Sequence, residues 1–345
     1  MREAEKILRK DVEQGIIKGA AVLAGTPDRT IYRGEFGFAE NALTCPMKTD
    51  TVIDCASVTK AAATVTALLV CHVRGMIDFD APFTEYLPDY KPVLRQRITV
   101  RNLADHTSGF IDPPAAPRSY FDESGRKMLE NILNLPPPCP IPAEPRYSCW
   151  NYILLSMIAE RITGRKFSDF CRTEIFLPLG MNDTSLGRPL PNLPLSRLAQ
   201  TIRTEAPGQI SDFVAYRIYR DGGCAGNAGM FSSCEDLAKL FCCYLRHGKT
   251  PDGKALFGES EFREIAPDTA RKVHGYRRFG WEIWNSHLFD SAFGTSLSHS
   301  GWSGQTVFMD FRKNMYVIVL TIRNDCYEQA KIDRYAVIRD LYENC

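Results

Sequence analysis

The sequence lacks any apolar run long enough to cross a lipid bilayer, which takes about 20 residues. Its longest apolar stretch, residues 61–73, is interrupted by Thr64, Thr66 and His72. Residues 1–10 are strongly charged and carry no apolar segment of the kind found in secretion signals. We therefore predict no membrane span and a cytoplasmic location.

An excess of charge of either sign is also missing. The 345 residues include 42 Lys and Arg against 41 Asp and Glu, so the formal net charge is +1. No basic run stands out, which argues against nucleic-acid binding as the main task. The content of 44% apolar and 24% charged residues is typical of a globular protein with a large buried core.

Cysteine is plentiful, with 12 residues, but metal-ligand spacing is absent. There is no C-x-x-C and no paired Cys and His motif. Cys242 and Cys243 are adjacent on a helix predicted over residues 234–245, so they cannot face the same partner. The pattern predicts buried free thiols, and we expect neither a metal nor an organic cofactor.

The nucleophile motif G-x-S-x-G of α/β-hydrolases is missing as well, because residues 301–305 match it except for Gln at the last position. A different serine motif, S-x-x-K, occurs at Ser57–Lys60 and at Ser124–Lys127. The second copy precedes no long apolar run, so we interpret it as a solvated loop or helix start.

The first copy directly precedes an alanine-rich apolar run. Residues three apart share a helix face, so the Lys60 amine can reach the Ser57 hydroxyl. A desolvated lysine near other cations can lose its proton near neutral pH and then activate a serine nucleophile. The alternative is an N-cap serine followed by a surface lysine.

Two further polar clusters follow, namely Tyr147-Ser148 before an apolar run and His299-Ser300-Gly301-Trp302 before an alternating segment. The order Ser/Lys, Tyr, His-x-Gly resembles the serine beta-lactamase and penicillin-binding-protein superfamily. The sequences at 106–109 (HTSG) and 226–232 (GNAGMFS) are similar to that superfamily too. The resemblance covers nearly the whole chain, and is to class C beta-lactamases and family VIII carboxylesterases.

Periodicity predicts helices over 2–14, 152–164 and 327–344, and strands over 20–25, 30–36, 279–284, 305–311 and 315–322. A hairpin turn is predicted at Lys313-Asn314. Strand-rich ends around a helical middle favour an α/β (α+β) fold, and the resemblance implies the same: an antiparallel sheet flanked by helices, plus an inserted helical lobe. We predict one discontinuous lobe (1–75 and 206–345), a mainly helical lobe (76–205), and an active site between them.

The resemblance implies a role for each cluster. Ser57 is expected to be the nucleophile, Lys60 the base or proton relay, and Tyr147 the second proton-transfer group. His299 stands where many beta-lactamases carry a lysine that meets a substrate carboxylate, and histidine offers a weaker, pH-dependent charge. The backbone N–H groups of Ser57 and Trp302 are expected to form the oxyanion hole.

Four residues are predicted to contact the substrate: Cys149, Ser300, Gly301 and Asn227. Cys149 departs from the family pattern, because class C beta-lactamases have Tyr-x-Asn where this chain has Tyr147-Ser148-Cys149. The family asparagine binds a substrate amide, whereas a thiol is a weak donor and a weak acceptor. Asn151 lies two residues too late to replace it, and we interpret His106 as structural.

These features predict a serine hydrolase that forms an acyl-enzyme on a small-molecule ester, amide or beta-lactam. A carboxylesterase with weak or no beta-lactamase activity is favoured. The alternatives are a beta-lactamase or D-amino-acid peptidase and, from another class, a non-catalytic binding protein with this fold. We further predict that Tyr120, Phe121 and Trp150 line the acyl or leaving-group pocket. No oligomeric state is predicted.

Overall fold

The computed structural model describes residues 1–94, 97–110, 124–134, 136, 145–267, 276–283 and 292–344. Its main layer is an antiparallel sheet of seven strands in the order β2-β1-β10-β9-β8-β7-β6. These strands are β1 (Ile17–Gly25), β2 (Thr30–Gly37), β6 (Arg277–Arg278), β7 (Trp281–Glu282), β8 (Ser296–Ser300), β9 (Gln305–Asp310) and β10 (Met315–Arg323). A second sheet, in the order β3-β5-β4, comprises β3 (Ile53–Asp54), β4 (Ser185–Leu186) and β5 (Met230–Ser232).

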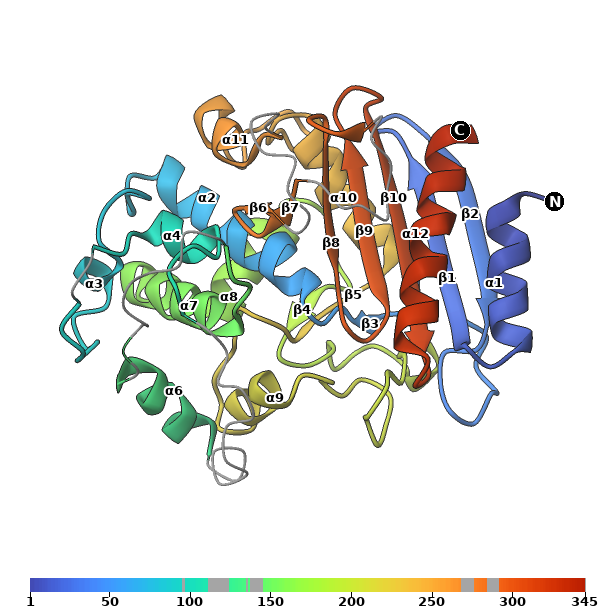
Figure 1. The fold of residues 1–345 in the computed structure, drawn as a ribbon, viewed down its shortest axis with the longest axis horizontal. Helices are drawn as coiled ribbons and strands as arrows, with labels where there is room; N and C mark the ends of the chain where they lie inside the picture. The colour runs from blue at the N-terminus through green and yellow to red at the C-terminus, as the bar shows by residue number, and fades with distance from the viewer. Residues whose placement is uncertain are drawn as a thin grey trace.

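Helices cover the sheet and fill the middle of the chain. They are α1 (Glu3–Glu13), η1 (Lys60–Val65), α2 (Thr66–Val73), α3 (Phe83–Tyr86), α4 (Val100–Ala104), α6 (Gly125–Asn134), α7 (Cys149–Thr163), α8 (Phe167–Cys171), η2 (Arg172–Phe176), η3 (Leu195–Arg197), α9 (Phe213–Arg220), α10 (Cys234–Leu245), α11 (Glu259–Ile265) and α12 (Tyr327–Asn344). In Figure 1, α1 and α12 lie across the near face of the sheet, and α3, α4, α6, α7 and α8 gather at the opposite end of the molecule.

Both faces of the central strands are buried, although the sheet is antiparallel. Successive side chains of a strand point to opposite faces. On β1, Val22 packs in the cluster with α1 and α12, whereas Leu23 joins the larger core on the other side. Val319 and Leu320 divide in the same way on β10, which pairs with β1. The two ends of the chain therefore meet in the centre of the sheet.

Most of the predicted elements are present. The helices predicted over 2–14, 234–245 and 327–344 are α1, α10 and α12, in that order. The strands predicted over 20–25, 30–36, 305–311 and 315–322 are β1, β2, β9 and β10. The helix predicted from residue 152 begins earlier, at Cys149, and ends at Gly164 in the left-handed conformation. The second S-x-x-K copy is a helix start, as predicted, since Ser124 Oγ accepts a hydrogen bond from Lys127 N–H.

The prediction of one strand over 279–284 is wrong. Residues 277–278 and 281–282 form two short strands, β6 and β7, paired as a hairpin. Phe279 and Gly280 between them have φ of 45° and 73°, and positive φ at both central residues is the requirement of a type I′ turn. Periodicity alone does not reveal this reversal, and residue 284 lies outside the described ranges.

One hydrophobic core runs through the sheet and the helical part. It includes Leu23 and Leu320 from the sheet together with Leu154 and Phe167 from α7 and α8. The division into lobes of 1–75 with 206–345 and of 76–205 stays a prediction. In the described ranges, no helix is both long enough and apolar enough to cross a membrane.

The cysteines of the described ranges are all free. The prediction of free thiols is confirmed for them, whereas burial holds only for some. Cys55, Cys171 and Cys234 are among the buried ones, and Cys326 is exposed.

Candidate active site

Ser57 stands on a strained turn between β3 and the helix that follows. Ala56, directly before it, has φ of 45°, a left-handed conformation that is costly for a residue with a Cβ. The carboxylate of Asp54 supports the turn, since it accepts hydrogen bonds from Ala56 N–H at 3.1 Å and from Ser211 N–H at 2.7 Å. Burial raises the pKa of Asp54 to about 6, although these hydrogen bonds oppose the rise.

The turn delivers Ser57 to the surface of an otherwise buried segment. Ser57 is half-buried, whereas its neighbours from 51 to 56 and from 58 to 70 are buried. Lys60, one turn further, is fully buried, and its Nζ lies 3.0 Å from Ser57 Oγ and 2.8 Å from the Asn227 carbonyl oxygen. The Lys60 amine therefore reaches the Ser57 hydroxyl, as the spacing predicts, and it is not a surface lysine.

Tyr147 is brought to the same place by the start of α7. Ser148 is the N-cap of this helix, its Oγ accepting a hydrogen bond from Trp150 N–H, so Tyr147 is the last residue before the cap. Lys60 Nζ lies 4.9 Å from the centroid of the Tyr147 ring. Tyr147 is 41% exposed, so a ligand over Ser57 can reach it.

A buried polar network packs against Tyr147 and the start of α7. The His106 ring lies 4.6 Å from the Tyr147 ring, and His106 Nδ1 accepts hydrogen bonds from Ser148 N–H and from Asn151 Nδ2, both at 3.1 Å. Asn151 in turn accepts a hydrogen bond from Ser108 Oγ at 2.6 Å. His106 therefore has the structural role that we predicted, and its specific task is to position the start of α7.

The electrostatics favour a protonated Lys60. Burial lowers its pKa, but the nearby Cys149 and Tyr147, when ionised, and the carboxylate of Asp212 raise that pKa above the ordinary value for lysine. An ammonium has three donors, and two of them are used by Ser57 Oγ and the Asn227 carbonyl oxygen, while the Tyr147 ring lies 4.9 Å away. This direction does not favour the loss of the Lys60 proton near neutral pH, and that expectation stays a prediction.

Tyr147 also holds its proton more tightly than a free phenol. Loss of hydration raises its pKa, and the positive charges of Lys60 and Arg277 only partly counter the rise. The guanidinium of Arg277 lies 5.1 Å from the centroid of the Tyr147 ring. The resting site thus contains a phenol and an ammonium side by side.

The end of β8 runs directly against the Ser57 turn. A Cβ on Gly301 would lie 2.9 Å from the Cys55 carbonyl oxygen and 3.2 Å from Ala56 Cβ, so only glycine allows this approach. The next residue is Trp302. Among the residues that the structure describes, neither Ser57 N–H nor Trp302 N–H has a hydrogen-bond acceptor. Both amides are thus available to an oxyanion, which is what the oxyanion-hole prediction requires.

His299 does not present a charge. It is fully buried, and burial together with the positive charges of Arg277 and Lys60 lowers its pKa well below the ordinary value. A cation at this position would be both desolvated and repelled, which does not favour the predicted pH-dependent charge for a substrate carboxylate, and that role stays a prediction. His299 Nδ1 lies 3.1 Å from the Ser300 carbonyl oxygen, and its buried Nε2 has no partner in the described ranges.

The remaining predicted contacts differ in position. The hydroxyl of the half-buried Ser300 lies 3.0 Å from that of Tyr335 on α12 and 3.3 Å from that of Thr306. Asn227 contributes its carbonyl to Lys60, and Cys149 is half-buried next to Lys60 and Tyr147. Trp150 is buried in the core. The predicted pocket residues at 120 and 121 lie outside the described ranges.

Three residues of this site were missed by sequence reasoning. Asp212 is the N-cap of α9, and its carboxylate helps to raise the pKa of Lys60. Arg277, on the β6–β7 hairpin, lies over the Tyr147 ring. Asn151 fixes His106. The N-cap pattern of an aspartate before an amphipathic helix could have revealed Asp212 as a helix start, but no local pattern connects Arg277 with Tyr147.

Comparison with known proteins agrees with this architecture. A family model described as Beta-lactamase matches residues 4–341. The chain belongs to the beta-lactamase family. The Bacillus subtilis (strain 168) N-acetylmuramyl-L-alanine amidase is 25% identical over 93% of this chain and 80% of its own length. A putative D-alanyl-D-alanine carboxypeptidase of Escherichia coli (strain K12) is 26% identical over 85% of this chain and 76% of its own.

Among solved structures, EstCE1, described as a hydrolase with promiscuous acyltransferase activity, superposes with a TM-score of 0.75. It is 18% identical and covers 97% of both chains. At that identity the likeness concerns the fold, which is that of the serine beta-lactamases and penicillin-binding proteins. Members of the family are hydrolases that act on small-molecule ester, amide or beta-lactam bonds.

Proposed function

We propose that this protein is a carboxylesterase that forms an acyl-enzyme on Ser57, with weak or no beta-lactamase activity. One observation carries the proposal: Lys60 Nζ lies 3.0 Å from the half-buried Ser57 hydroxyl and 4.9 Å from the centroid of the Tyr147 ring. An accessible serine that is hydrogen-bonded to an amine, with a phenol beside that amine, is the arrangement of an activated nucleophile.

The proposed reaction has two halves. The Lys60–Tyr147 pair first releases one proton to solvent. Ser57 Oγ then bonds to the substrate carbonyl carbon while its proton passes to that pair, and the oxyanion accepts hydrogen bonds from Ser57 N–H and Trp302 N–H. The carbon–oxygen bond to the leaving alkoxide then breaks, and the pair returns the proton to that oxygen. Water next attacks the acyl carbon, gives its proton to the pair, and Ser57 Oγ leaves with that proton.

Two features favour an ester over a beta-lactam. Cys149 occupies the position of an asparagine that would hold a substrate amide, and a thiol hydrogen-bonds weakly. The neutral, buried His299 supplies no cation where many relatives carry a lysine. An ester has a better leaving group than an amide and depends less on such contacts.

The test combines covalent labelling with a substrate panel. We expect a fluorophosphonate to add one adduct to the folded protein, read by intact mass, and Ser57→Ala to abolish it. Short-chain 4-nitrophenyl esters should be hydrolysed much faster than nitrocefin. A nitrocefin rate equal to that of the best ester contradicts the ester preference. An adduct that persists in Ser57→Ala removes Ser57 from the mechanism, and the absence of any adduct favours a non-catalytic binding protein.

An amide hydrolase is the second candidate. The relatives named as an N-acetylmuramyl-L-alanine amidase and a putative D-alanyl-D-alanine carboxypeptidase cover most of this chain, and the same acyl-enzyme chemistry cleaves amides. Hydrolysis of D-aminoacyl amides at rates above those of matched esters would favour this candidate. The cytoplasmic location stays a prediction, and cell-wall peptides would not be available there.

A further inference from the structure

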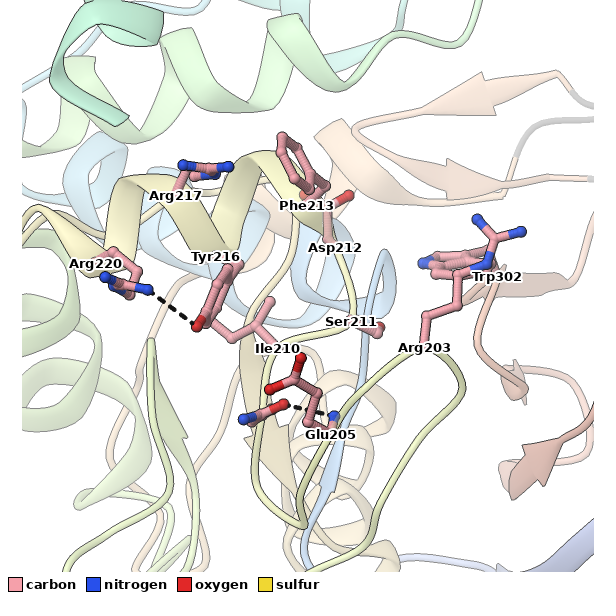
Figure 2. A pocket seen from close by; sticks show the side chains of 11 residues that line it. Arg203, Glu205, Ile210, Ser211, Asp212, Phe213, Tyr216, Arg217, Arg220 and Trp302 are labelled. Carbon is pink, nitrogen blue, oxygen red and sulfur yellow. Dashed lines mark hydrogen bonds between the residues drawn. The ribbon is translucent and has the colours of Figure 1, made fainter. Parts of the chain in front are cut away.

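A cavity of about 470 Å³ opens beside the proposed oxyanion hole. Ser211, Asp212 and Trp302 line the part nearest the site, and α9 forms another wall. Figure 2 shows Trp302 and Arg203 together on one side of this cavity, with Tyr216, Arg217 and Arg220 on α9 across from them. Because Trp302 N–H is one of the two proposed oxyanion donors, this cavity adjoins the proposed site, and a substituent of the substrate can reach it.

The cavity is rich in arginines without acidic partners. Arg203, Arg217 and Arg220 line it, and none of the three forms an ion pair in the described part of the chain. Arg220 Nη1 lies 3.5 Å from the Tyr216 hydroxyl, and the Arg217 guanidinium lies 5.0 Å from the centroid of the Phe213 ring. Guanidinium groups with free donors suit carboxylate or phosphate oxygens.

The acidic residues of the cavity do not neutralise it. Asp212 Oδ1 accepts hydrogen bonds from Ala215 N–H at 2.8 Å and from Asn227 Nδ2 at 3.4 Å, and its charge acts on Lys60. Glu205 is therefore the one other carboxylate among the lining residues. Positive charge remains in excess.

Arg203 is held over the cavity at a conformational cost. Its φ is 62°, a left-handed conformation that a residue with a Cβ rarely adopts and that often marks functional positions. Its guanidinium lies 5.2 Å from the centroid of the Trp302 ring, and that of Arg323 lies 4.9 Å from it. The indole of Trp302, with two guanidiniums close to its ring, forms a wall beside the oxyanion donors.

We propose that this cavity binds a carboxylate, or a comparable anionic group, carried by the substrate close to its scissile ester. The inference deepens the proposed function and rests on it. The preferred substrates are thus monoesters whose acyl or leaving group ends in an anion, rather than esters of simple neutral acids.

Two matched ester pairs test the proposal. One pair is 4-nitrophenyl hydrogen adipate and 4-nitrophenyl methyl adipate, which differ by a carboxylate on the acyl side. The other is 4-acetoxybenzoate and its methyl ester, which differ on the leaving-group side. At low salt we expect kcat/KM to be about five-fold or more higher for the anionic member of one pair, the size expected for one or two exposed charge pairs. If the adipate pair shows the difference in kcat/KM, the cavity receives the acyl group. If the acetoxybenzoate pair shows it, the cavity receives the leaving group.

The charge origin is tested with variants and salt. We expect the anionic-to-neutral ratio to fall to about one in Arg203→Gln/Arg217→Gln/Arg220→Gln, to fall partly in each single variant, and to fall in 0.5 M NaCl. Arg29→Gln is the matched control, since Arg29 is exposed on the β1–β2 turn and lines a separate cavity. Equal rates within both pairs, or a ratio unchanged by the triple substitution, overturn the inference.

The anion site can also be tested if the protein proves not to be an esterase. If no ester is hydrolysed, calorimetric titration with monomethyl adipate still tests the cavity. Binding by the wild type that is lost in the triple variant supports an anion site on a protein without esterase activity. An absence of binding then overturns the inference as well.

Discussion

At the scale of single residues, the charge of one lysine governs the chemistry. Lys60 is fully buried, and burial by itself favours the neutral amine. Its two acceptors and the nearby acidic groups outweigh burial, so the pKa of Lys60 lies above the ordinary value. The pair of Lys60 and Tyr147 therefore has to lose a proton before it can accept the proton of Ser57.

The first prediction concerns pH. Because the surroundings raise the pKa of both Lys60 and Tyr147, the fraction of protein with a deprotonated pair grows as pH rises. We expect kcat/KM for a stable ester to increase by about ten-fold per pH unit on this limb, without a plateau below pH 8. Ser57→Ala supplies the background of hydroxide-driven hydrolysis. A rate independent of pH between 6 and 8 contradicts the assignment of a protonated resting pair.

The second prediction concerns the proton carriers themselves. Lys60→Ala and Tyr147→Phe should each slow single-turnover acylation by at least about 100-fold, the lower range for a positioned acid or base. Lys127→Ala is the control for lysine loss, since Lys127 belongs to the second S-x-x-K copy and is 52% exposed on α6. A near-normal acylation rate in either site variant, with Lys127→Ala also normal, removes that residue from the mechanism.

At the scale of elements, the site depends on three segment ends meeting. The turn after β3 carries Ser57, the start of α7 carries Tyr147, and the end of β8 carries Gly301 and Trp302. The close approach of Gly301 to the Cys55 carbonyl is the contact that brings the last of these segments to the nucleophile.

The third prediction tests that approach. In Gly301→Ala the new Cβ would lie 2.5 Å from Gln305 Oε1 and 2.9 Å from the Cys55 carbonyl oxygen, so the strand end has to move away. Loss of one oxyanion donor costs about 100 to 1000-fold, and we expect a decrease in acylation of at least about ten-fold. Acylation at the wild-type rate contradicts the role of Trp302 N–H.

The fourth prediction concerns the effect of backbone strain on the free energy of unfolding. Gly164 ends α7 with φ of 65°, and no atom lies within 4 Å of an added Cβ. Gly164→Ala should therefore lower the free energy of unfolding by about 1 kcal/mol through the left-handed backbone alone. Urea denaturation measures this, and Gly164→Asn should cost less because asparagine tolerates that conformation. An unchanged free energy in Gly164→Ala contradicts the argument.

At the scale of the whole molecule, one core joins the sheet to the helical part. Leu23 and Leu320 belong to the same cluster as Leu154 and Phe167, although the chain order predicts two lobes. Residues from both proposed lobes also make up the site, because Tyr147 lies in 76–205 and Ser57 and Trp302 lie outside it.

The fifth prediction follows from the shared core. We expect urea unfolding followed by far-UV circular dichroism and by tryptophan fluorescence to give coincident single transitions. The lobes cannot lose their common core one at a time without exposing apolar surface. Two separated transitions would show that 76–205 folds as an independent unit.

The sequence by itself determined the elements and the identity of the candidate chemistry. Alternation predicts β2, which buries one face, continuous apolar runs predict β1 and β10, which bury both, and 3.6-residue periodicity predicts α12. The S-x-x-K spacing predicts that Lys60 reaches Ser57, since that distance is set within one helical turn. Such properties depend on neighbours along the chain, and a single sequence contains them.

Only the tertiary structure decided the electrostatic surroundings of these residues and which residues lie next to them in space. Burial lowers the pKa of His299, the neighbours of Lys60 raise its pKa, and Arg277 lies over Tyr147 because segments far apart in the chain pack together. The turn at Phe279-Gly280 and the arginine-lined cavity beside Trp302 arise in the same way. Burial and electrostatic interactions depend on distance in space, which no local pattern of residues contains.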